Sequence, residues 1–167
     1  MNLEFQVTGL DELRRRLNEL PGKLQRRVLK DAVKDAAQLI QKAAQEKAPV
    51  AAEIIFRQAI RKTGKRAGSK YRSRILPGTL KKSITVRQNR KAARRQIIFQ
   101  IGPSKRAFYG QFVERGHVLR RKAKGEVVGH VPAMPFMRPA IEENAQKAID
   151  VMRRRLSVGL DQVVEGK

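Results

Sequence analysis

The residues that could support catalysis or metal binding are few and scattered. The chain of 167 residues has no cysteine and two histidines, His117 and His130, both in basic stretches. A metal site needs three or four converging ligands, which this spacing does not supply. Glu142 and Glu143 are adjacent, and neighbours on a helix point in different directions. Phosphate-binding loops and nucleophile motifs are absent from the sequence. We therefore expect no enzyme activity, no metal and no cofactor.

Glu114 is the one carboxylate whose surroundings are unusual. It follows Phe112-Val113 and precedes Arg115-Gly116, at the end of a long stretch without acidic residues. Two interpretations are open. The carboxylate could form an ion pair with a basic group of its own or a neighbouring subunit, or it could occupy an ordinary surface position.

Positive charge is concentrated in the middle of the chain. The net charge is +23, and residues 54–113 carry 17 lysines and arginines but no aspartate or glutamate. Such a field repels itself unless it faces an anion, which could be nucleic acid, an acidic protein surface or a membrane. The alternative is a generally basic surface that favours solubility. Candidate contacts to DNA or to an acidic partner are Arg61, Lys62, Lys65, Arg66, Lys70, Arg72, Arg74, Arg90, Lys91, Arg94 and Arg95.

Sequence-specific reading of nucleic acid is not indicated. The chain shows no helix-turn-helix, no zinc-finger spacing and no aromatic RNA-binding motif. Phosphate contacts from the basic segments would be salt-sensitive and sequence-blind. Tyr71, Phe108 and Tyr109 could stack on bases, but we expect Phe108 and Phe112 to belong to the core and Tyr71 to lie in a loop.

Membrane insertion and secretion are not indicated either. The apolar runs are far shorter than the ~20 residues that a membrane span needs. The first residues lack the basic start and apolar stretch of a signal peptide. We expect synthesis in the cytoplasm and no membrane contact.

Three helices are predicted from apolar spacing. After a short strand at 3–7 and a Thr8 N-cap, a helix carries leucines at positions 10, 13, 17 and 20 and ends at Pro21-Gly22. A longer helix runs from about 23 to 47, where Ala48-Pro49 stops it. The last begins at about 138 or 139 and continues into the 150s or 160s.

The middle of the chain predicts strands and basic loops. We expect a short helix at 51–61, a mobile loop at 62–70, and strands at 80–87 and 96–101 that form an antiparallel hairpin around a basic turn at 88–94. Residues 108–113 fit a third strand or a short helix, 115–129 a basic loop, and 131–139 an extended proline-rich segment. The prediction is one α+β domain over 1–167, with a small antiparallel sheet packed by the long N-terminal and C-terminal helices. A flexible basic insertion is expected at 50–77.

Five pieces, in this order along nearly the whole chain, resemble a known family. They are Val7-Thr8-Gly9-Leu10-Asp11-Glu12-Leu13, Lys47-Ala48-Pro49, Gly78-Thr79-Leu80-Lys81-Lys82-Ser83-Ile84, Phe108-Tyr109-Gly110-Gln111-Phe112-Val113-Glu114-Arg115-Gly116 and Pro132-Ala133-Met134-Pro135-Phe136-Met137-Arg138-Pro139-Ala140. Together they are similar to the tail-component family of tailed phages, which is gene-ten-product-like and also called tail-completion or head–tail joining proteins.

The resemblance implies a structural protein of the virion neck, made in the host bacterial cytoplasm. An α+β subunit would form a ring, with hexameric symmetry favoured, between the head connector and the tail. Its partners would be copies of itself, neighbouring connector and tail proteins and, as an alternative target of the basic loops, the DNA in the channel. The signature residues would be structural. Gly78, Leu80, Ser83 and Ile84 set the strand start; Tyr109, Glu114 and Gly116 form a turn; Pro135, Phe136, Pro139 and Ala140 anchor the last helix.

Two departures from the family pattern stand out. Residues 50–77 separate Ala48-Pro49 from the Gly78 motif, which usually follows closely, and Glu114-Arg115-Gly116-His117 replaces the usual Glu-Phe-Gly-Thr. The rival interpretation is a free basic protein that binds nucleic acid through phosphate contacts. An enzyme, such as a phosphoesterase dependent on His117, is a third class and has the least support.

Overall fold

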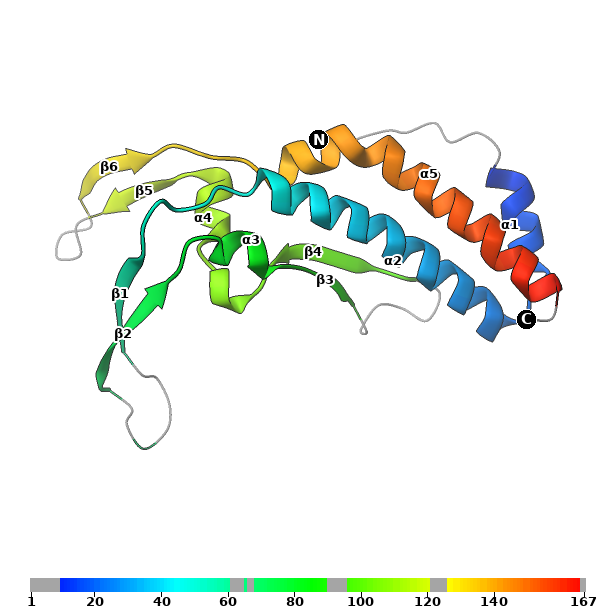
Figure 1. The fold of residues 1–167 in the computed structure, drawn as a ribbon, viewed down its shortest axis with the longest axis horizontal. Coiled ribbons are helices and arrows are strands. Elements are labelled where there is room, and N and C mark those ends of the chain that lie inside the picture. The colour runs from blue at the N-terminus through cyan, green and yellow to red at the C-terminus, as the bar shows by residue number, and fades with distance from the viewer. Residues whose placement is uncertain (1–9, 61–64, 66–67, 90–95, 121–125, 166–167) are drawn as a thin grey trace. The chain divides into compact units, whose positions relative to one another are not determined.

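The computed structural model describes the chain except residues 1–9, 61–64, 66–67, 90–95, 121–125 and 166–167 (Figure 1). The fold is α+β, as predicted. Its elements in chain order are α1 (Leu10–Asn18), α2 (Gly22–Lys47), β1 (Ile55–Ile60), β2 (Lys70–Ile75), α3 (Thr79–Ser83), β3 (Ile84–Gln88), β4 (Phe99–Pro103), the 3-10 turn η1 (Lys105–Ala107), α4 (Gly110–Arg115), β5 (His117–Arg120), β6 (Val127–Val131) and α5 (Met137–Val164).

The chain divides into two compact units. One, called here the helical unit, comprises Met1–Ala43, Val86–Gly102 and Arg138–Lys167. The other, the hairpin unit, comprises Ala44–Thr85 and Pro103–Met137. Each is described by itself below. The expectation of one domain over the whole chain stays a prediction.

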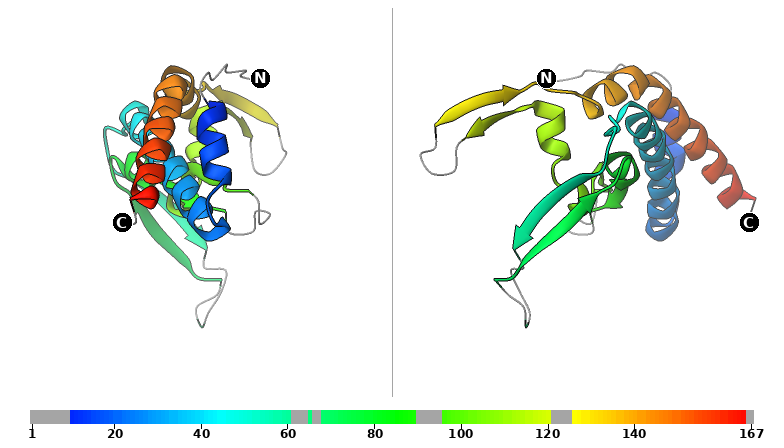
Figure 2. Two further views of the ribbon diagram at one scale, coloured as in Figure 1. Left: turned by 90° about the vertical axis from the view of Figure 1, so that its right-hand side faces the viewer. Right: turned by 60° about the vertical axis from the view of Figure 1, so that its left-hand side comes forward.

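Close packing of α2 against α5 builds the core of the helical unit (Figures 1 and 2). Val28 and Ala32 of α2 form a buried cluster with Leu156 of α5, and partly buried residues of α1 and α5 pack against it. Gly159 permits the approach, because a Cβ there would lie 2.8 Å from Cγ1 of Val28. Small side chains at a helix contact shorten the distance between axes, which explains the alanine-rich stripe of α2.

Ion pairs also join the helices of this unit. Arg16 of α1 donates to Asp161 of α5 at 2.7 Å, and Arg155 of α5 lies 3.2 Å from Asp35 of α2. The pairs are partly exposed, so each stabilises by about 1 kcal/mol or less. The predictions of the three helices are confirmed to within a few residues. The predicted strand at 3–7 and the Thr8 cap lie outside the described residues.

The β3–β4 hairpin is confirmed, but its start was predicted wrongly. The two strands run in opposite directions (Figure 1), and the Asn89 amide donates to the Ile98 carbonyl at 2.8 Å. Residues 79–83 are helical rather than extended. The backbone turns at Gly78, whose φ is +74°, and the Thr79 hydroxyl donates to the Leu76 carbonyl at 2.6 Å. This turn buries Leu80 and Ser83, which a strand would direct to opposite faces.

The helix predicted at 51–61 is wrong, because β1 is a strand that pairs antiparallel with β2. Ile55 is opposite Ile75 and Ile60 is opposite Lys70. A short isolated helix does not offset its nucleation cost, whereas a hairpin gives backbone groups partners from both strands. Of the loop predicted to be mobile at 62–70, the structure describes only Lys65 and residues 68–70. Lys70 is the first residue of β2.

The region after β4 contains more regular structure than predicted. Residues 108–113, for which strand and helix were both left open, form a turn at 108–109 and then the first four residues of α4. The basic loop predicted at 115–129 is wrong, since β5 and β6 pair antiparallel with a register shift between Leu119 and Arg120. The described residues thus contain three two-stranded sheets, β1–β2, β3–β4 and β5–β6. The extended proline-rich segment is confirmed after Val131, and it leads into α5 at Met137.

Candidate functional site

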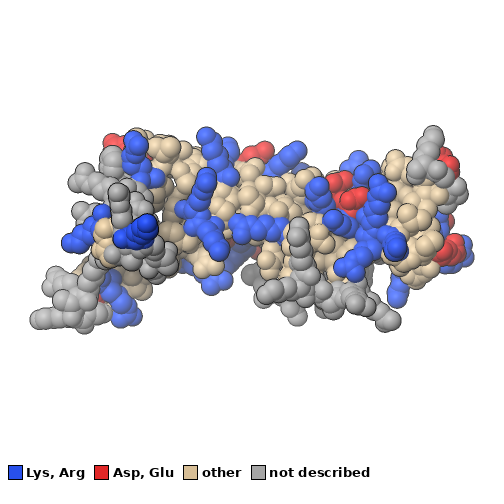
Figure 3. Space-filling model, turned by 90° about the horizontal axis from the view of Figure 1, so that it is seen from below, with Lys and Arg blue, Asp and Glu red and all other residues tan. Residues whose placement is uncertain are grey.

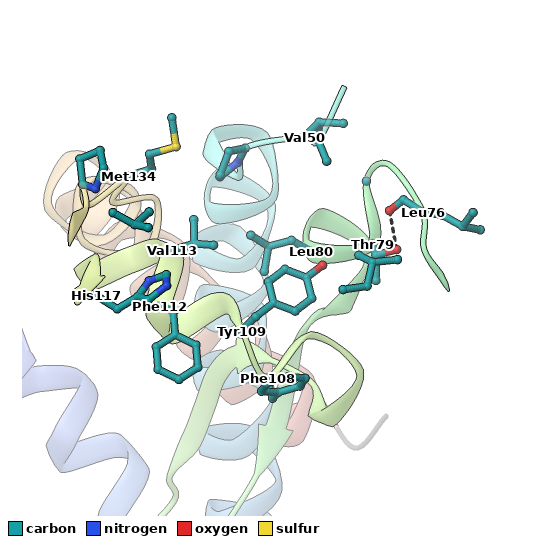
Figure 4. Close-up of a pocket in the computed structure, with 16 residues that line it drawn as sticks. Val50, Leu76, Thr79, Leu80, Phe108, Tyr109, Phe112, Val113, His117 and Met134 are labelled. Atoms are coloured by element: carbon teal, nitrogen blue, oxygen red, sulfur yellow. Dashed lines mark hydrogen bonds between the residues drawn. The ribbon is translucent and has the colours of Figure 1, made fainter. Parts of the chain in front are cut away.

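The hairpin unit contains an apolar pocket of about 580 Å³ (Figure 4). Four stretches of chain converge on it, and all lining residues except Thr79, Tyr109 and His117 are apolar or glycine. The lining consists of Pro49, Val50, Ala51, Ile75, Leu76, Gly78, Thr79, Leu80, Phe108, Tyr109, Phe112, Val113, His117, Val131, Pro132 and Met134. A pocket of this size and character is typical of a binding site rather than of a packing defect.

The approach of α4 to α3 depends on Gly110. A Cβ at Gly110 would lie 2.6 Å from Cγ of Pro103 and 3.0 Å from Cδ1 of Leu80, so any side chain would push α4 away. This close contact brings Tyr109 and Val113 beside Leu80 in the lining (Figure 4). Glycine at this position is therefore a requirement of the pocket's geometry.

Hydrogen bonds hold α3 in place. The Ser83 hydroxyl donates to the Leu80 carbonyl at 2.7 Å, and the Ser104 amide donates to the Ser83 carbonyl at 2.9 Å. Gln45 Nε2, near the end of α2, donates to the Ile84 carbonyl at 3.1 Å. Leu80, Ser83 and Ile84 are buried, and their role as signature residues of the family stays a prediction.

Glu114 fixes the beginning of α5. Its Oε2 accepts hydrogen bonds from the amides of Phe136 at 2.8 Å and Met137 at 2.9 Å. A carboxylate at a helix N-terminus satisfies backbone donors that have no partner within the helix and interacts favourably with the helix dipole. The interpretation of Glu114 as an ordinary surface residue is therefore wrong, and the interpretation as an ion-pair partner stays a prediction.

Gly116 allows β6 and the proline-rich segment to pass close to the end of α4. Its φ is +68° and its ψ 173°, a combination almost restricted to glycine. A Cβ there would lie 2.6 Å from the Val131 carbonyl oxygen and 2.9 Å from the Ala133 nitrogen. The Met134 amide also donates to the Val113 carbonyl at 2.8 Å. These contacts bring Pro132 and Met134 to the pocket.

The remaining signature residues lie at the start of α5. Phe136 and Ala140 are fully buried, whereas Pro135 is exposed. Pro139 lies in the first turn of α5, where a missing amide hydrogen costs no helical bond. The anchoring role that the resemblance implies for these residues stays a prediction.

Large apolar side chains of the lining remain open to solvent. The exposed fractions are 56% for Val50, 54% for Leu76, 49% for Phe108, 48% for Phe112 and 60% for Met134. The expectation that Phe108 and Phe112 belong to the core is therefore wrong. They contact polar rings instead: Phe108 packs edge-on to Tyr109 at 6.0 Å between centroids, and Phe112 lies 5.3 Å from His117.

Burial affects two polar groups of the lining in different ways. Burial raises the pKa of the Tyr109 hydroxyl above its ordinary value of 10.0. His117 Nδ1 is buried and has no hydrogen-bond partner among the residues that the structure describes. Both groups belong to an apolar pocket, where a bound molecule could supply the missing hydrogen bond.

None of the predicted basic contacts that the structure describes lines the pocket. Lys65, Lys70 and Arg74 are exposed on the β1–β2 hairpin and its connection, and the side chain of Arg72 in β2 is not described. Arg61, Lys62, Arg66, Arg90, Lys91, Arg94 and Arg95 lie outside the described residues. Lysine and arginine side chains are spread across the face shown in Figure 3, where acidic residues form only small groups.

Sequence reasoning missed the pocket because its residues are distant along the chain. Val50, Leu76 and Met134 are each next to a proline in the sequence. This was the only local signal that they lie outside helices and strands. Among the described residues, no group of three potential ligands could hold a metal ion, and no helix is long and apolar enough to cross a membrane.

The described fold is α+β, with Gly116 in a turn at the end of α4 and the Glu114 carboxylate capping the start of α5. A sequence profile of the HK97-gp10-like family, described as "Bacteriophage HK97-gp10, putative tail-component", matches residues 11–116. The chain belongs to this family, as the resemblance indicated. The match ends at Gly116, so the β5–β6 hairpin, the proline-rich segment and α5 lie beyond it. Comparisons with curated proteins and with solved structures gave no match.

Proposed function

We propose that the protein is a non-enzymatic structural component of the phage virion that forms a ring between head connector and tail. The membership in a family of phage tail components, over residues 11–116, carries this proposal. Hexameric symmetry is the favoured arrangement. Head-to-tail contacts between identical subunits generate such a ring when the rotation closes.

The exposed apolar surface of the β5–β6 hairpin supports assembly with other subunits. Val118, Leu119, Val127 and Val128 are each close to half exposed or more. A two-stranded sheet is marginal by itself, and an apolar hairpin with open edges is typical of an element that pairs with a neighbouring chain. Assembly would cover these side chains and complete the hairpin's hydrogen bonding.

A phage lacking the protein tests the proposed role. A nonsense mutation in the gene should yield filled heads and finished tails that accumulate separately, as seen by electron microscopy of infected-cell lysates. Expression of the wild-type gene from a plasmid should restore joined particles. Joined, infectious virions that lack this protein would contradict the proposal.

Cryo-electron microscopy of the virion neck tests the ring itself. Six copies in a closed layer between connector and tail are expected. Another copy number would contradict hexameric symmetry but leave the proposed joining role intact. Density for the protein elsewhere in the virion would contradict its proposed location between head connector and tail.

A second candidate is a free protein that binds nucleic acid through phosphate contacts. The net charge of +23 and the exposed Lys65, Lys70 and Arg74 favour it. Tight binding of the isolated chain to random duplex DNA at physiological salt would support this alternative. Replacing those three residues with glutamine should then reduce the salt slope by about 3, since each phosphate contact contributes about 0.9. Glutamine at the exposed Lys23, Lys34 and Lys42 of α2 is the charge-matched control.

A further inference from the structure

The pocket of the hairpin unit is large enough for several side chains of a partner. Its volume of about 580 Å³ compares with a cavity of about 150 Å³ that holds benzene. Its open apolar residues, Val50, Leu76, Phe108, Phe112 and Met134, each expose about half of their surface or more. Nothing within the described part of the chain covers them. A ligand that buries them gains from removing this surface from water.

The segments that form the pocket are basic. Exposed lysines and arginines flank the lining residues on α3, η1 and α4, namely Lys81, Lys82, Lys105, Arg106 and Arg115. Glu114, the carboxylate within these segments, accepts hydrogen bonds from the start of α5. The whole hairpin unit contains 18 lysines and arginines against four acidic residues. A partner must therefore carry negative charge as well as apolar side chains.

This combination distinguishes between classes of partner. A second copy that presented its own basic hairpin unit would bring like charge to this surface, which opposes that particular contact. Duplex DNA has the required charge, but its stacked bases supply no side chains to fill an apolar pocket. An acidic polypeptide segment with large apolar residues satisfies both requirements.

We propose that this pocket is a docking site for an acidic segment of another protein, which inserts aromatic or aliphatic side chains between Phe108, Phe112 and Met134. Buried aromatic or aliphatic anchors in a central pocket with a polar rim are the usual source of affinity in such interfaces. Tyr109 and His117 Nδ1 are the polar groups available to orient the bound backbone. That the partner is another virion protein rests on the proposed function, whereas the binding itself does not.

Three labelled peptides of equal length test the required chemistry by fluorescence anisotropy with the full chain. The first alternates glutamate with leucine and phenylalanine, the second alternates glutamate with serine, and the third alternates lysine with leucine and phenylalanine. The first should bind at least tenfold more tightly than either of the others. Equal binding of the glutamate–serine peptide, or of the lysine peptide, would overturn the proposal, because charge or apolar contact alone would then suffice.

Substitutions in the pocket locate the binding. Phe112→Ser and Met134→Ser should each raise the Kd of the first peptide at least tenfold. Val158→Ser is the matched control, because Val158 is 46% exposed on α5 in the helical unit. Lys105→Glu with Arg106→Glu should also weaken binding, whereas Lys34→Glu with Lys42→Glu on α2 should weaken it much less. Equal effects of pocket and control variants would overturn the assignment.

A fluorescent probe keeps the test valid if a serine variant fails to fold. The chain has no cysteine, so Met134→Cys provides a single labelling site at the pocket. An environment-sensitive dye there should shift to the blue when the first peptide binds, and the same dye at Val158→Cys should not. No shift at Met134→Cys at peptide concentrations that saturate the anisotropy signal would place binding elsewhere.

The other occupants are outcomes of the same experiments. Displacement of the peptide by a random DNA duplex, with DNA binding sensitive to Met134→Ser, would identify nucleic acid as the occupant and overturn the proposal. Self-association in sedimentation experiments that is abolished by Met134→Ser would identify a second copy of the chain as the occupant and would also overturn the proposal. A phage mutant that fails to join heads and tails, while the peptide does not bind, would overturn this inference and leave the proposed function intact.

Discussion

The carboxylate of Glu114, at the end of α4, lies 2.8 Å from the backbone nitrogen of Phe136, the residue that precedes α5. The two residues are separated by 22 positions, and Phe136 is fully buried. This hydrogen bond, together with the one from Met137, ties the signature turn of the family to the start of the last helix. It gives a structural role to the carboxylate that directly follows residues 54–113, which contain no aspartate or glutamate.

Removal of the Glu114 carboxylate should destabilise the protein. Glu114→Ala leaves two amides without this acceptor at a helix N-terminus, and we expect a loss of about 2 kcal/mol in the free energy of unfolding. Glu114→Gln keeps a carbonyl acceptor but loses the charge, so about half of that loss is expected. Urea denaturation followed by circular dichroism measures both.

The control for this prediction is Glu53→Ala. Glu53 is an exposed acid in the same unit, and its removal should change stability by less than about 0.5 kcal/mol. Similar losses for Glu53→Ala and Glu114→Ala would show that the effect comes from net charge rather than from the hydrogen bonds to Phe136 and Met137.

Alanine substitutions at three glycines should form a graded series. Gly22→Ala meets no atom within 4 Å and should be neutral or slightly stabilising. Gly78→Ala has open space but a φ of +74°, so strain of about 1 kcal/mol is expected. Gly116→Ala combines a positive φ with contacts of 2.6 and 2.9 Å, and we expect a loss of at least about 3 kcal/mol. Thermal unfolding ranks the stability of the three variants. A Gly116→Ala protein as stable as Gly78→Ala would show that the backbone of Val131 and Ala133 does not lie this close to Gly116.

The contact between Gly159 and Val28 predicts coupling between α5 and α2. On an exposed helix Gly→Ala would stabilise by about 1 kcal/mol, but here the new Cβ would meet Val28 at 2.8 Å. Gly159→Ala should therefore destabilise by about 1 kcal/mol. Combined with Val28→Ala, which opens space, the double variant should be more stable than the sum of the single effects predicts. Strict additivity in this double-mutant cycle would show that the helices are not packed this closely.

The raised pKa of Tyr109 predicts a dependence of stability on alkaline pH. Burial favours the neutral hydroxyl in the folded state, so above the ordinary value of 10.0 the unfolded chain loses this proton first. The contribution of Tyr109 is fully present below that pH and is lost as pH rises through the folded pKa. The unfolding free energy of the wild type should therefore fall more steeply above about pH 10 than that of Tyr109→Phe. Parallel curves for the two proteins would contradict a partly buried hydroxyl whose pKa is raised.

The helices and the family were accessible from the sequence, whereas the hairpins were not. The stripes of α2 and α5 repeat at helical spacing within each segment, and Ala48-Pro49 marks the end of the first. The β1–β2 and β5–β6 hairpins were predicted as a helix and loops, because their strands are short and their stability depends on pairing with the opposite strand. Residues 80–83 were predicted as the start of a strand for a similar reason: the turn at Gly78 and the burial of Leu80 depend on segments far along the chain.

The sequence by itself determined the α+β class, the long helices, the basic middle and the motifs that identify the family. These properties follow from local spacing, composition and the order of short motifs. Only the tertiary structure decided that four distant stretches line an apolar pocket and that Glu114 caps α5. It also decided that the backbone of residues 131–133 passes close to Gly116. Each of these depends on contacts between residues that are not neighbours in sequence, and such contacts leave no periodic pattern in the chain.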